Sequence, residues 1–349
     1  WLVSVFKAHQ KWAEIDFKTQ RLYRQGLALF ASHELSDGSR AGSKQLADFT
    51  KAFVDAIYAN LLIVEHKDKC GTVVKRERRR FANAAMTACR RAWFVGQRAQ
   101  EAIVPPVNPF ARMGLKSRGP GQAVRETPTA TWEELVLFRR AASRLGYQSV
   151  ATAALLSWEW LQREEHIFSA FEIAHYRPKE RPDSVKIVHP KNGEEAWWPL
   201  FDERRHSLFP ELAAELDALK GRITSGLVFR RDHAHRKSSD LVPWITERKD
   251  LRYLRHVVKK IIMAAGLRKE LSFTSFRHGG FTEGADSDLT DAELRTAGRH
   301  RSRQQLPTYA KRTQKQLIVA AKKRREERTR TGVPLDGALV PLSPIDSAM

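Results

Sequence analysis

Apolar side chains recur at helical spacing through the first hundred residues of the chain. One run steps by four positions: Phe49, Phe53, Ile57 and Leu61. A second run steps by three or four positions: Phe81, Ala85, Ala88 and Ala92. Spacing of this kind places apolar side chains on one face of a helix, where they can pack against a core. The pattern therefore predicts a helical region over residues 1–104.

Proline, glycine and serine interrupt this pattern after residue 104. A Pro-Pro pair at 105–106 ends the helical region, and residues 112–129 combine Gly, Ser, Pro and Arg with little periodicity, which is typical of a linker. The helical pattern returns where Thr131 and Glu134 have capping-box spacing. We therefore expect four segments: a helical domain over 1–111, a linker over 112–129, a second domain over 130–331 and a loose tail over 332–349.

The second domain carries one strand signal among its predicted helices. Apolar and polar side chains alternate over residues 185–188, and Asn192-Gly193 is a turn dipeptide. Residues 196–200 then supply a second strand, so the pattern predicts a β-hairpin. The predicted helices are 150–165, 208–220, 250–265, a short helix that Thr290 and Glu293 open and Gly298 ends, and a basic helix over 308–330. The pattern thus predicts a mainly α chain with a small antiparallel β-hairpin, which is an α+β fold class.

Composition narrows the class of protein. Of the 349 residues 42% are hydrophobic, which is enough for packed cores and argues against a largely disordered chain. No run approaches the ~20 consecutive apolar residues of a membrane span, and charges among the first eleven residues argue against a signal peptide. With only Cys70 and Cys89, the chain lacks a disulfide scaffold and a four-cysteine metal site, and a reducing cytoplasm is expected. The chain opens on Trp1 rather than methionine, which is compatible with a fragment of a longer protein.

Positive charge is clustered as well as abundant. Sixty-one Lys and Arg face forty Asp and Glu, a net charge of +21, and ten of the basic but only two of the acidic residues lie between 67 and 98. In a folded protein with this net charge the Lys and Arg side chains repel one another unless a polyanion binds to the surface. The charge therefore predicts nucleic acid as the partner. A generally basic protein with a solvated helix face is the alternative. The candidate DNA-binding residues are Lys75, Arg76, Arg78, Arg79, Arg80, Arg90 and Arg91.

The densest group of chemistry-bearing residues lies towards the C-terminal end. An Arg277-His278 pair is followed by His300, which stands after a Gly-Arg dipeptide, and nine residues later by Tyr309. Here the sequence resembles the tyrosine recombinase family, also called the phage-integrase family. Its members carry an Arg-His pair in a helical segment, a later Gly-His and a tyrosine nine residues after that histidine. The two-domain layout extends the resemblance over nearly all of the chain.

The resemblance implies further catalytic positions and their roles. Arg163 lies where the family places its first arginine, and Lys191, just before the predicted turn, lies where it places its hairpin lysine. In this family the two arginines and the histidine hold the phosphate, the tyrosine attacks phosphorus, and the lysine protonates the leaving 5′ oxygen. The catalytic candidates are therefore Arg163, Lys191, Arg277, His300 and Tyr309.

Elementary chemistry explains why these residue types suit a phosphodiester. Its negative charge must be neutralised during attack, and a guanidinium binds two oxygens at once and stays protonated. A phenol has a pKa of about 10, and neighbouring cations ease loss of its proton. The phosphotyrosine bond stores the phosphodiester energy, so no ATP, metal or other cofactor is expected. Asp232, His233 and His235 are spaced like metal ligands, but no further ligand pair matches, and we expect a polar loop there.

Two positions depart from the family pattern. Thr274 stands three residues before Arg277, where the family usually has histidine, and a hydroxyl cannot act as a base near pH 7. Either His278 or another group compensates, or the reaction is slower, so Thr274 and His278 are the accessory candidates. His166 stands three residues after Arg163, where the family often has glutamate.

The resemblance implies a site-specific DNA recombinase or integrase of a phage or mobile element, with a core-binding and a catalytic domain closing on duplex DNA. The expected partners are double-stranded DNA, further copies of the chain in a tetramer on paired sites, and accessory DNA-bending proteins, but no membrane. The expected location is the bacterial cytoplasm, at the nucleoid. A type IB topoisomerase-like enzyme and an inactive DNA-binding regulator of the same fold stay open as alternatives. The basic helix after Tyr309 either docks on a neighbouring copy through Leu317, Ile318 and Val319 or folds back on its own domain.

Overall fold

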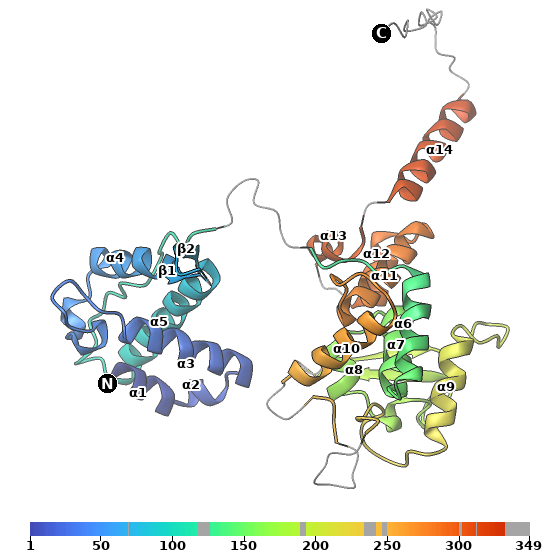
Figure 1. Ribbon diagram of the computed structural model, residues 1–349, viewed down its shortest axis with the longest axis horizontal. Helices are drawn as coiled ribbons and strands as arrows, with labels where there is room; N and C mark the ends of the chain where they lie inside the picture. Colours follow the sequence, from blue (N-terminus) through green and yellow to red (C-terminus); the bar gives the residue numbers. More distant parts are fainter. Residues whose placement is uncertain are drawn as a thin grey trace, which may run out of the picture. The chain divides into compact units, whose positions relative to one another are not determined.

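The chain divides into two compact units, Trp1–Val124 and Arg125–Met349 (Figure 1). The structure is a computed structural model that describes residues 1–68, 70–117, 126–188, 193–233, 242–245, 250–299, 302–311 and 313–331. Each unit has its own hydrophobic core. The division at residue 124 falls within the predicted linker.

Unit 1, the N-terminal unit, is helical with one two-stranded β-ribbon. Its α-helices are α1 (Leu2–Ala8), α2 (Gln10–Ala13), α3 (Phe17–Ala31), α4 (Lys51–Leu62) and α5 (Arg79–Ala99). Two 3-10 turns, η1 (Ala41–Ser43) and η2 (Leu46–Asp48), lie between α3 and α4. The strands β1 (Ile63–Lys67) and β2 (Val73–Glu77) pair antiparallel between α4 and α5.

The ribbon corrects the prediction that residues 1–104 are helical throughout. Ile63 and Val64 begin β1, and Val73 and Val74 begin β2. β-branched side chains of this kind favour strands over helices. Gly71 lies in the connection at φ 82°, a left-handed conformation that glycine adopts without steric cost.

The core of unit 1 forms where α3 lies against α5. A Cβ atom on Gly26 would stand only 2.8 Å from the Cα atom of Ala85, so the two backbones approach more closely than a larger residue at this position allows. On α5, the ring of Trp93 lies 6.0 Å from that of Phe49. The Trp93 indole also donates a 3.1 Å hydrogen bond to the carbonyl of Pro105, which fixes the segment after α5 on the core.

Unit 2, the C-terminal unit, is a helical domain with one β-hairpin. Its α-helices are α6 (Trp132–Arg144), α7 (Gln148–Glu159), α8 (Glu164–Ser169), α9 (Pro210–Lys220), α10 (Arg252–Ala264), α11 (Phe273–Asp286), α12 (Asp291–Gly298), α13 (Leu306–Tyr309) and α14 (Gln314–Thr331). The 3-10 turns are η3 (Ile173–His175) and η4 (Arg303–Gln305). β3 (Ser184–Val188) and β4 (Glu195–Pro199) pair antiparallel. The predicted α+β class is confirmed, and no helix in the described part of the chain is long and apolar enough to cross a membrane.

Predicted capping boxes open two helices of unit 2. The Thr131 hydroxyl accepts from the backbone N–H of Glu134, whose carboxylate accepts from the N–H of Thr131 in return, and α6 begins there. Thr290 and Glu293 form the same pair before α12. The predicted end of α12 at Gly298 is confirmed, and the next residue, Arg299, takes φ 54°.

Two predicted helices are interrupted. The helix predicted over 150–165 ends with α7, because the chain turns at Leu161, where φ is 52°, and Arg163 then precedes α8 as its N-cap residue. The helix predicted over 308–330 is replaced by α13 and α14. The Thr313 hydroxyl accepts from the backbone N–H of Gln316, which is the hydrogen bond of a new helix start.

Two consecutive glycines let α11 lie directly on α7. A Cβ atom on Gly279 would stand 2.0 Å from the Trp158 ring, and one on Gly280 would stand 2.2 Å from the Trp158 carbonyl oxygen. The Trp158 indole donates a 2.7 Å hydrogen bond to Glu283 of α11. The close packing of α11 on α7 buries the residues of α11 just before the two glycines, among them Arg277.

Glu159, at the end of α7, destabilises the folded chain at alkaline pH. Burial, aided by the negative charges of Glu283 and Glu211, raises the pKa of Glu159 to about 7, and Arg139 opposes the shift. The folded state therefore holds a proton that the unfolded state releases near its ordinary pKa of 4.5, and stability falls as the pH rises from 4.5 through 7.

We expect Glu159→Gln to raise the free energy of unfolding at pH 8 by about 1–2 kcal/mol, allowing for partial solvent screening, because the amide carries no charge. The gain should shrink towards zero near pH 4.5, measured by urea denaturation at both pH values. The exposed Glu180 serves as control, and Glu180→Gln should change neither value. An equal gain at both pH values would contradict the explanation.

Candidate active site

Arg277 is a buried cation on the inner side of α11. Its side chain is only 2% exposed, and its Nη2 atom donates a 3.2 Å hydrogen bond to the carbonyl of Gly298, at the end of α12. Burial, followed by the positive charge of Arg163, lowers the pKa of Arg277 to about 9. A bound anion would offset both effects, so the site suits a negatively charged ligand such as a phosphodiester.

Tyr309, the last residue of α13, stacks against Arg277. The guanidinium carbon of Arg277 lies 4.9 Å from the centre of the tyrosine ring, which is within cation–π distance. The rings of His278 and Phe281 lie 4.8 and 5.1 Å from that of Tyr309. The structure therefore brings the predicted tyrosine and the predicted second arginine together, on elements that are separate in the chain.

Arg163 and Arg299 add further positive charge to this region. Arg163 precedes α8 and lies close enough to lower the pKa values of both Arg277 and Arg299. Burial is the larger cause at Arg299, and the carboxylate of Glu194 acts in the opposite direction. The guanidinium groups of Arg163, Arg277 and Arg299 are thus close enough to repel one another, and a bound anion would reduce this repulsion.

Arg299 also connects the candidate site to the β3–β4 hairpin. Its Nη1 atom donates to the carbonyl of Ile187 at 3.2 Å, and its Nη2 atom donates to the carbonyl of Glu194 at 2.9 Å. These carbonyls belong to the two arms of the hairpin. Sequence does not predict this role of Arg299, because no local pattern indicates hydrogen bonds between a side chain and two distant carbonyls.

Two predicted catalytic residues, Lys191 and His300, lie outside the described residues. Their roles stay predictions from the resemblance. Glu194, three residues after Lys191, accepts a hydrogen bond at its carbonyl from Arg299, the residue before His300.

The accessory candidates, Thr274 and His278, lie four residues apart on α11 and have different surroundings. His278 is 2% exposed, and burial, aided by the charges of Lys311 and Arg277, lowers its pKa to about 4 against the opposing charge of Glu126. The imidazole beside Tyr309 is therefore neutral at pH 7 and can accept a hydrogen bond. Thr274 instead lines a cavity of about 300 Å³, together with Glu164, Arg255, Val258, Lys259, Ser272 and Phe273.

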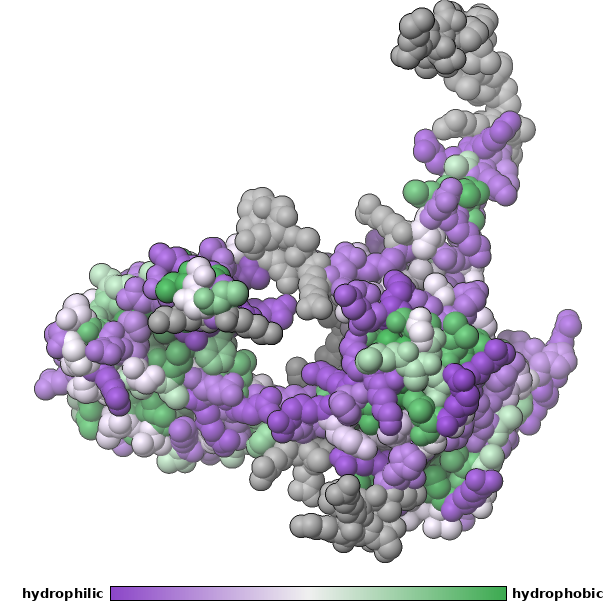
Figure 2. Space-filling model, in the orientation of Figure 1, coloured by the Kyte–Doolittle hydropathy of each residue, from purple (hydrophilic) through white to green (hydrophobic). Residues whose placement is uncertain are grey.

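The predicted DNA-binding residues all belong to unit 1. Lys75 and Arg76 lie on β2, Arg78 is the N-cap residue of α5, and the others lie along that helix: Arg79, Arg80, Arg90 and Arg91. All are exposed except Arg78 and Arg79, which are half-buried. Hydrophilic residues cover much of the visible surface of each unit (Figure 2).

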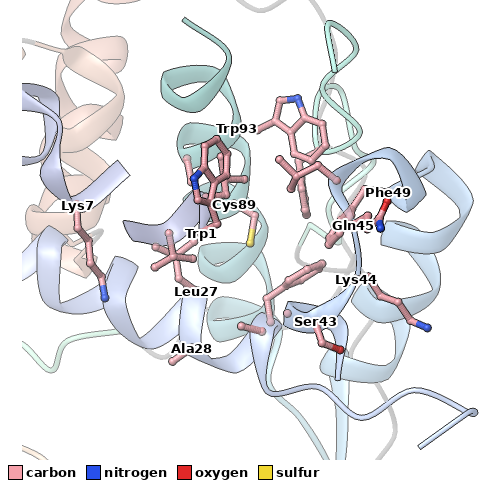
Figure 3. A pocket seen from close by; sticks show the side chains of 18 of the residues that line it. Trp1, Lys7, Leu27, Ala28, Ser43, Lys44, Gln45, Phe49, Cys89 and Trp93 are labelled. Atoms are coloured by element: carbon pink, nitrogen blue, oxygen red, sulfur yellow. The ribbon is translucent and has the colours of Figure 1, made fainter. Parts of the chain in front are cut away.

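A cavity lies among the helices of unit 1. It encloses about 770 Å³, and Figure 3 shows Leu27, Phe49, Cys89 and Trp93 among the side chains around it. Burial raises the pKa of the Cys89 thiol, which makes it a poor nucleophile.

The metal-like sequence around Asp232 has other contacts. The Asp232 carboxylate accepts hydrogen bonds from the backbone N–H and the hydroxyl of Ser149, at 2.7 and 2.6 Å. The ring of His233 packs edge-on against Tyr147 at 5.0 Å. His235 lies outside the described residues, within which no group of three potential ligands is arranged to hold a metal ion.

Comparison with known proteins identifies the fold. No protein-family model and no curated protein sequence matches the chain. Among solved structures, it is similar to a lambda integrase tetramer bound to a Holliday junction, with a TM-score of 0.59 and 14% identity over 88% of this chain and 76% of that one. It is similar to a lambda integrase dimer bound to a COC′ core site, with a TM-score of 0.57 and 15% identity over the same shares of the two chains.

A third similar structure is the Tn1549 transposon integrase in complex with circular intermediate DNA. Its TM-score is 0.52 and its identity 10%, over 92% of this chain and 98% of that one. At such low identity these likenesses concern the fold, and they extend over both units. The resemblance read from the Arg277, His300 and Tyr309 spacing is thereby confirmed at the level of architecture: the chain has the fold of the tyrosine recombinases.

Proposed function

We propose that the chain is a site-specific DNA recombinase that cleaves and rejoins strands through a 3′-phosphotyrosine intermediate. The observation that carries this proposal is the contact between Tyr309 and Arg277, at 4.9 Å, with Arg163 close enough to affect the charge of Arg277. A potential nucleophile and two phosphate-binding groups therefore share one place in a fold whose solved members include DNA-bound integrases.

Phosphate binding is the first step. Arg277 and Arg163 bind the non-bridging oxygens of the scissile phosphate, which relieves the repulsion between the two guanidinium groups. His300 donates to a further oxygen. The bound anion also favours the protonated form of Arg277, whose pKa is lowered by burial in the free protein.

Cleavage is the second step. The Tyr309 oxygen forms a bond to phosphorus as the bond from phosphorus to the 5′ oxygen breaks, and Lys191 gives that oxygen its proton. The phenolic proton passes to water as the bond to phosphorus forms. The imidazole of His278 packs on the tyrosine ring, and its pKa of about 4 makes it a hydrogen-bond acceptor for the phenol rather than the base that keeps the proton. Attack by a 5′ hydroxyl then reverses the step and releases the tyrosine.

DNA binding by unit 1 and assembly on paired sites complete the proposal. The basic residues of β2 and α5 bind duplex DNA, and the integrase tetramer on a Holliday junction supports exchange between four copies of the chain. We assign the enzyme to a phage or mobile element, with accessory DNA-bending proteins. The exposed Leu317 and Ile318 of α14 would contact a neighbouring copy.

A nicked duplex tests the chemistry. The chain first selects duplexes from a random library, and these are then nicked near each candidate cleavage position. After attack, the short fragment that carries the new 5′ hydroxyl diffuses away, so the covalent complex accumulates. We expect a covalent protein–DNA band whose peptide map places the DNA on Tyr309. Absence of any band on tightly bound duplexes would support the inactive regulator instead, and relaxation of supercoiled DNA without paired sites would support the topoisomerase-like enzyme.

A further inference from the structure

The β1–β2 ribbon of unit 1 exposes more surface than a structural hairpin needs. Every residue of β2 is exposed, and so are Ile63, Glu65 and His66 of β1. Ile63, Val73 and Val74 are 54%, 55% and 39% exposed, and Figure 2 shows apolar residues at the surface where Figure 1 places the ribbon. An isolated two-stranded ribbon is only marginally stable in water, so a partner surface is expected to cover it.

The two faces of the ribbon carry different charges. Residues directly opposite in an antiparallel pair share a face, and successive residues alternate. One side, the paired face, holds Ile63, Glu65, Lys67, Val73, Lys75 and Glu77. The other side, the open face, holds Val64, His66, Val74 and Arg76.

Both carboxylates of the ribbon lie on the paired face, and both are in ion pairs. Lys75 lies 3.4 Å from Glu65, and Glu77 lies 3.1 Å from Lys116, which belongs to a later segment of the same unit. The open face carries no carboxylate. It therefore has a net positive charge from Arg76, the exposed side chain of Val74, the half-buried side chain of Val64, and the hydrogen-bonding groups of His66 and Arg76.

The open face continues into a basic depression at the start of α5. Arg76 lines this depression together with Arg78, Arg79 and Arg80, beside Glu77 and Phe81. The first turn of α5 contains no acidic residue, so its free N–H groups add to the positive potential. A polyanion lying along the ribbon would meet this potential at the point where the strand joins the helix.

These observations fit duplex DNA better than a protein partner. The major groove is about 12 Å wide and admits a two-stranded ribbon. Arginine binds the edge of guanine with two hydrogen bonds, histidine can donate or accept, and a valine methyl can contact the methyl group of thymine. An acidic protein surface would match the charge but would leave the groove-sized shape of the ribbon unexplained.

We propose that the β1–β2 ribbon enters the major groove with its open face towards the base edges, and that His66, Val74 and Arg76 select the target sequence. The arginines of the depression then hold the phosphates at the edge of the groove. This inference rests on the proposed DNA-binding function and adds to it the element that reads sequence.

The test compares Arg76→Ala with Lys75→Ala, a matched control that removes the same charge from the neighbouring residue on the paired face. Full-length protein selects duplexes from a random library, and affinity is then measured for a selected and a scrambled duplex over a range of salt concentrations. We expect Arg76→Ala to lower affinity for the selected duplex by about 5- to 100-fold, with little loss on the scrambled one, and to relax the preference at one base pair. Because Lys75 is itself a candidate DNA-binding residue, Lys75→Ala should lower affinity for both duplexes by a similar small factor and leave the selected sequence unchanged. His66→Ala, as a second variant, should relax a neighbouring base pair.

Different outcomes separate the failures. If Arg76→Ala weakens both duplexes by the same factor and lowers the salt dependence by about one phosphate contact, Arg76 binds backbone and the inference is overturned. If the unaltered chain binds DNA but enriches no sequence, the ribbon is not a reader although DNA binding stands. If the unaltered chain binds no duplex at all, the proposed function fails together with the inference. Circular dichroism of each variant shows whether it is folded.

Discussion

Replacing Tyr309 with phenylalanine should abolish covalent attachment of the chain to DNA. The substitution removes the attacking oxygen and keeps the ring that packs on Arg277, His278 and Phe281. Loss of a nucleophile lowers the rate by about 10⁴-fold or more. The stability should change by only about 1 kcal/mol, the size of one hydrogen bond. The measurement is the covalent band formed on nicked duplexes, quantified on a denaturing gel.

A second tyrosine provides the control for this experiment. Tyr253 is 42% exposed on α10, and Tyr253→Phe should cleave at the rate of the unaltered chain. Both variants should bind intact duplexes equally well, because neither substitution removes a charge. A covalent band that persists in Tyr309→Phe, on another residue, would move the nucleophile elsewhere and remove the basis of the proposed mechanism.

Replacing Arg277 should lower the cleavage rate by about 10³-fold or more, the range found when a charged group that stabilises a phosphoryl transition state is removed. Arg277→Lys tests geometry as well as charge, because an ammonium cannot hold two phosphate oxygens in one plane. It should therefore recover little of the activity that Arg277→Ala loses. The measurement is the rate of covalent band formation under single-turnover conditions.

A neutral substrate separates this role from damage to the fold. A methylphosphonate in place of the scissile phosphate lacks the negative charge that Arg277 would neutralise, so Arg277→Ala should lose much less rate on it. The control is Arg268→Lys. Arg268 forms a 2.6 Å ion pair with Glu134, and the variant should cleave both substrates at the rate of the unaltered chain. If the methylphosphonate restores nothing in a variant that is still folded, Arg277 has a structural role only.

The sequence predicted the helical layout well where local signals decide it. The capping pairs that open α6 and α12 depend on residues three positions apart, and the β3–β4 hairpin follows from alternation around a turn. The joint position of Arg277 and Tyr309 was predicted through the family spacing. Their contact depends on how α11 and α13 pack, which spacing alone does not determine.

Other features depend on contacts that a linear pattern does not contain. The β1–β2 ribbon was missed because apolar residues on both sides of it repeat at helical spacing, although β-branched pairs on either side of Gly71 could have revealed it. The turn at Leu161 breaks a run that reads as continuous helix. The bonds from Arg299 to both arms of the hairpin join residues more than one hundred positions apart.

Arg299 combines an unfavourable backbone conformation with two favourable side-chain hydrogen bonds. Its left-handed conformation suits glycine and costs an arginine roughly 1–2 kcal/mol. Two hydrogen bonds to the hairpin recover about that amount, since each contributes about 1 kcal/mol. A glycine here would relax α12 and release the hairpin at nearly constant overall stability. Screens that rank variants by melting temperature would therefore pass over this position, and only an assay that follows the hairpin itself would detect the exchange.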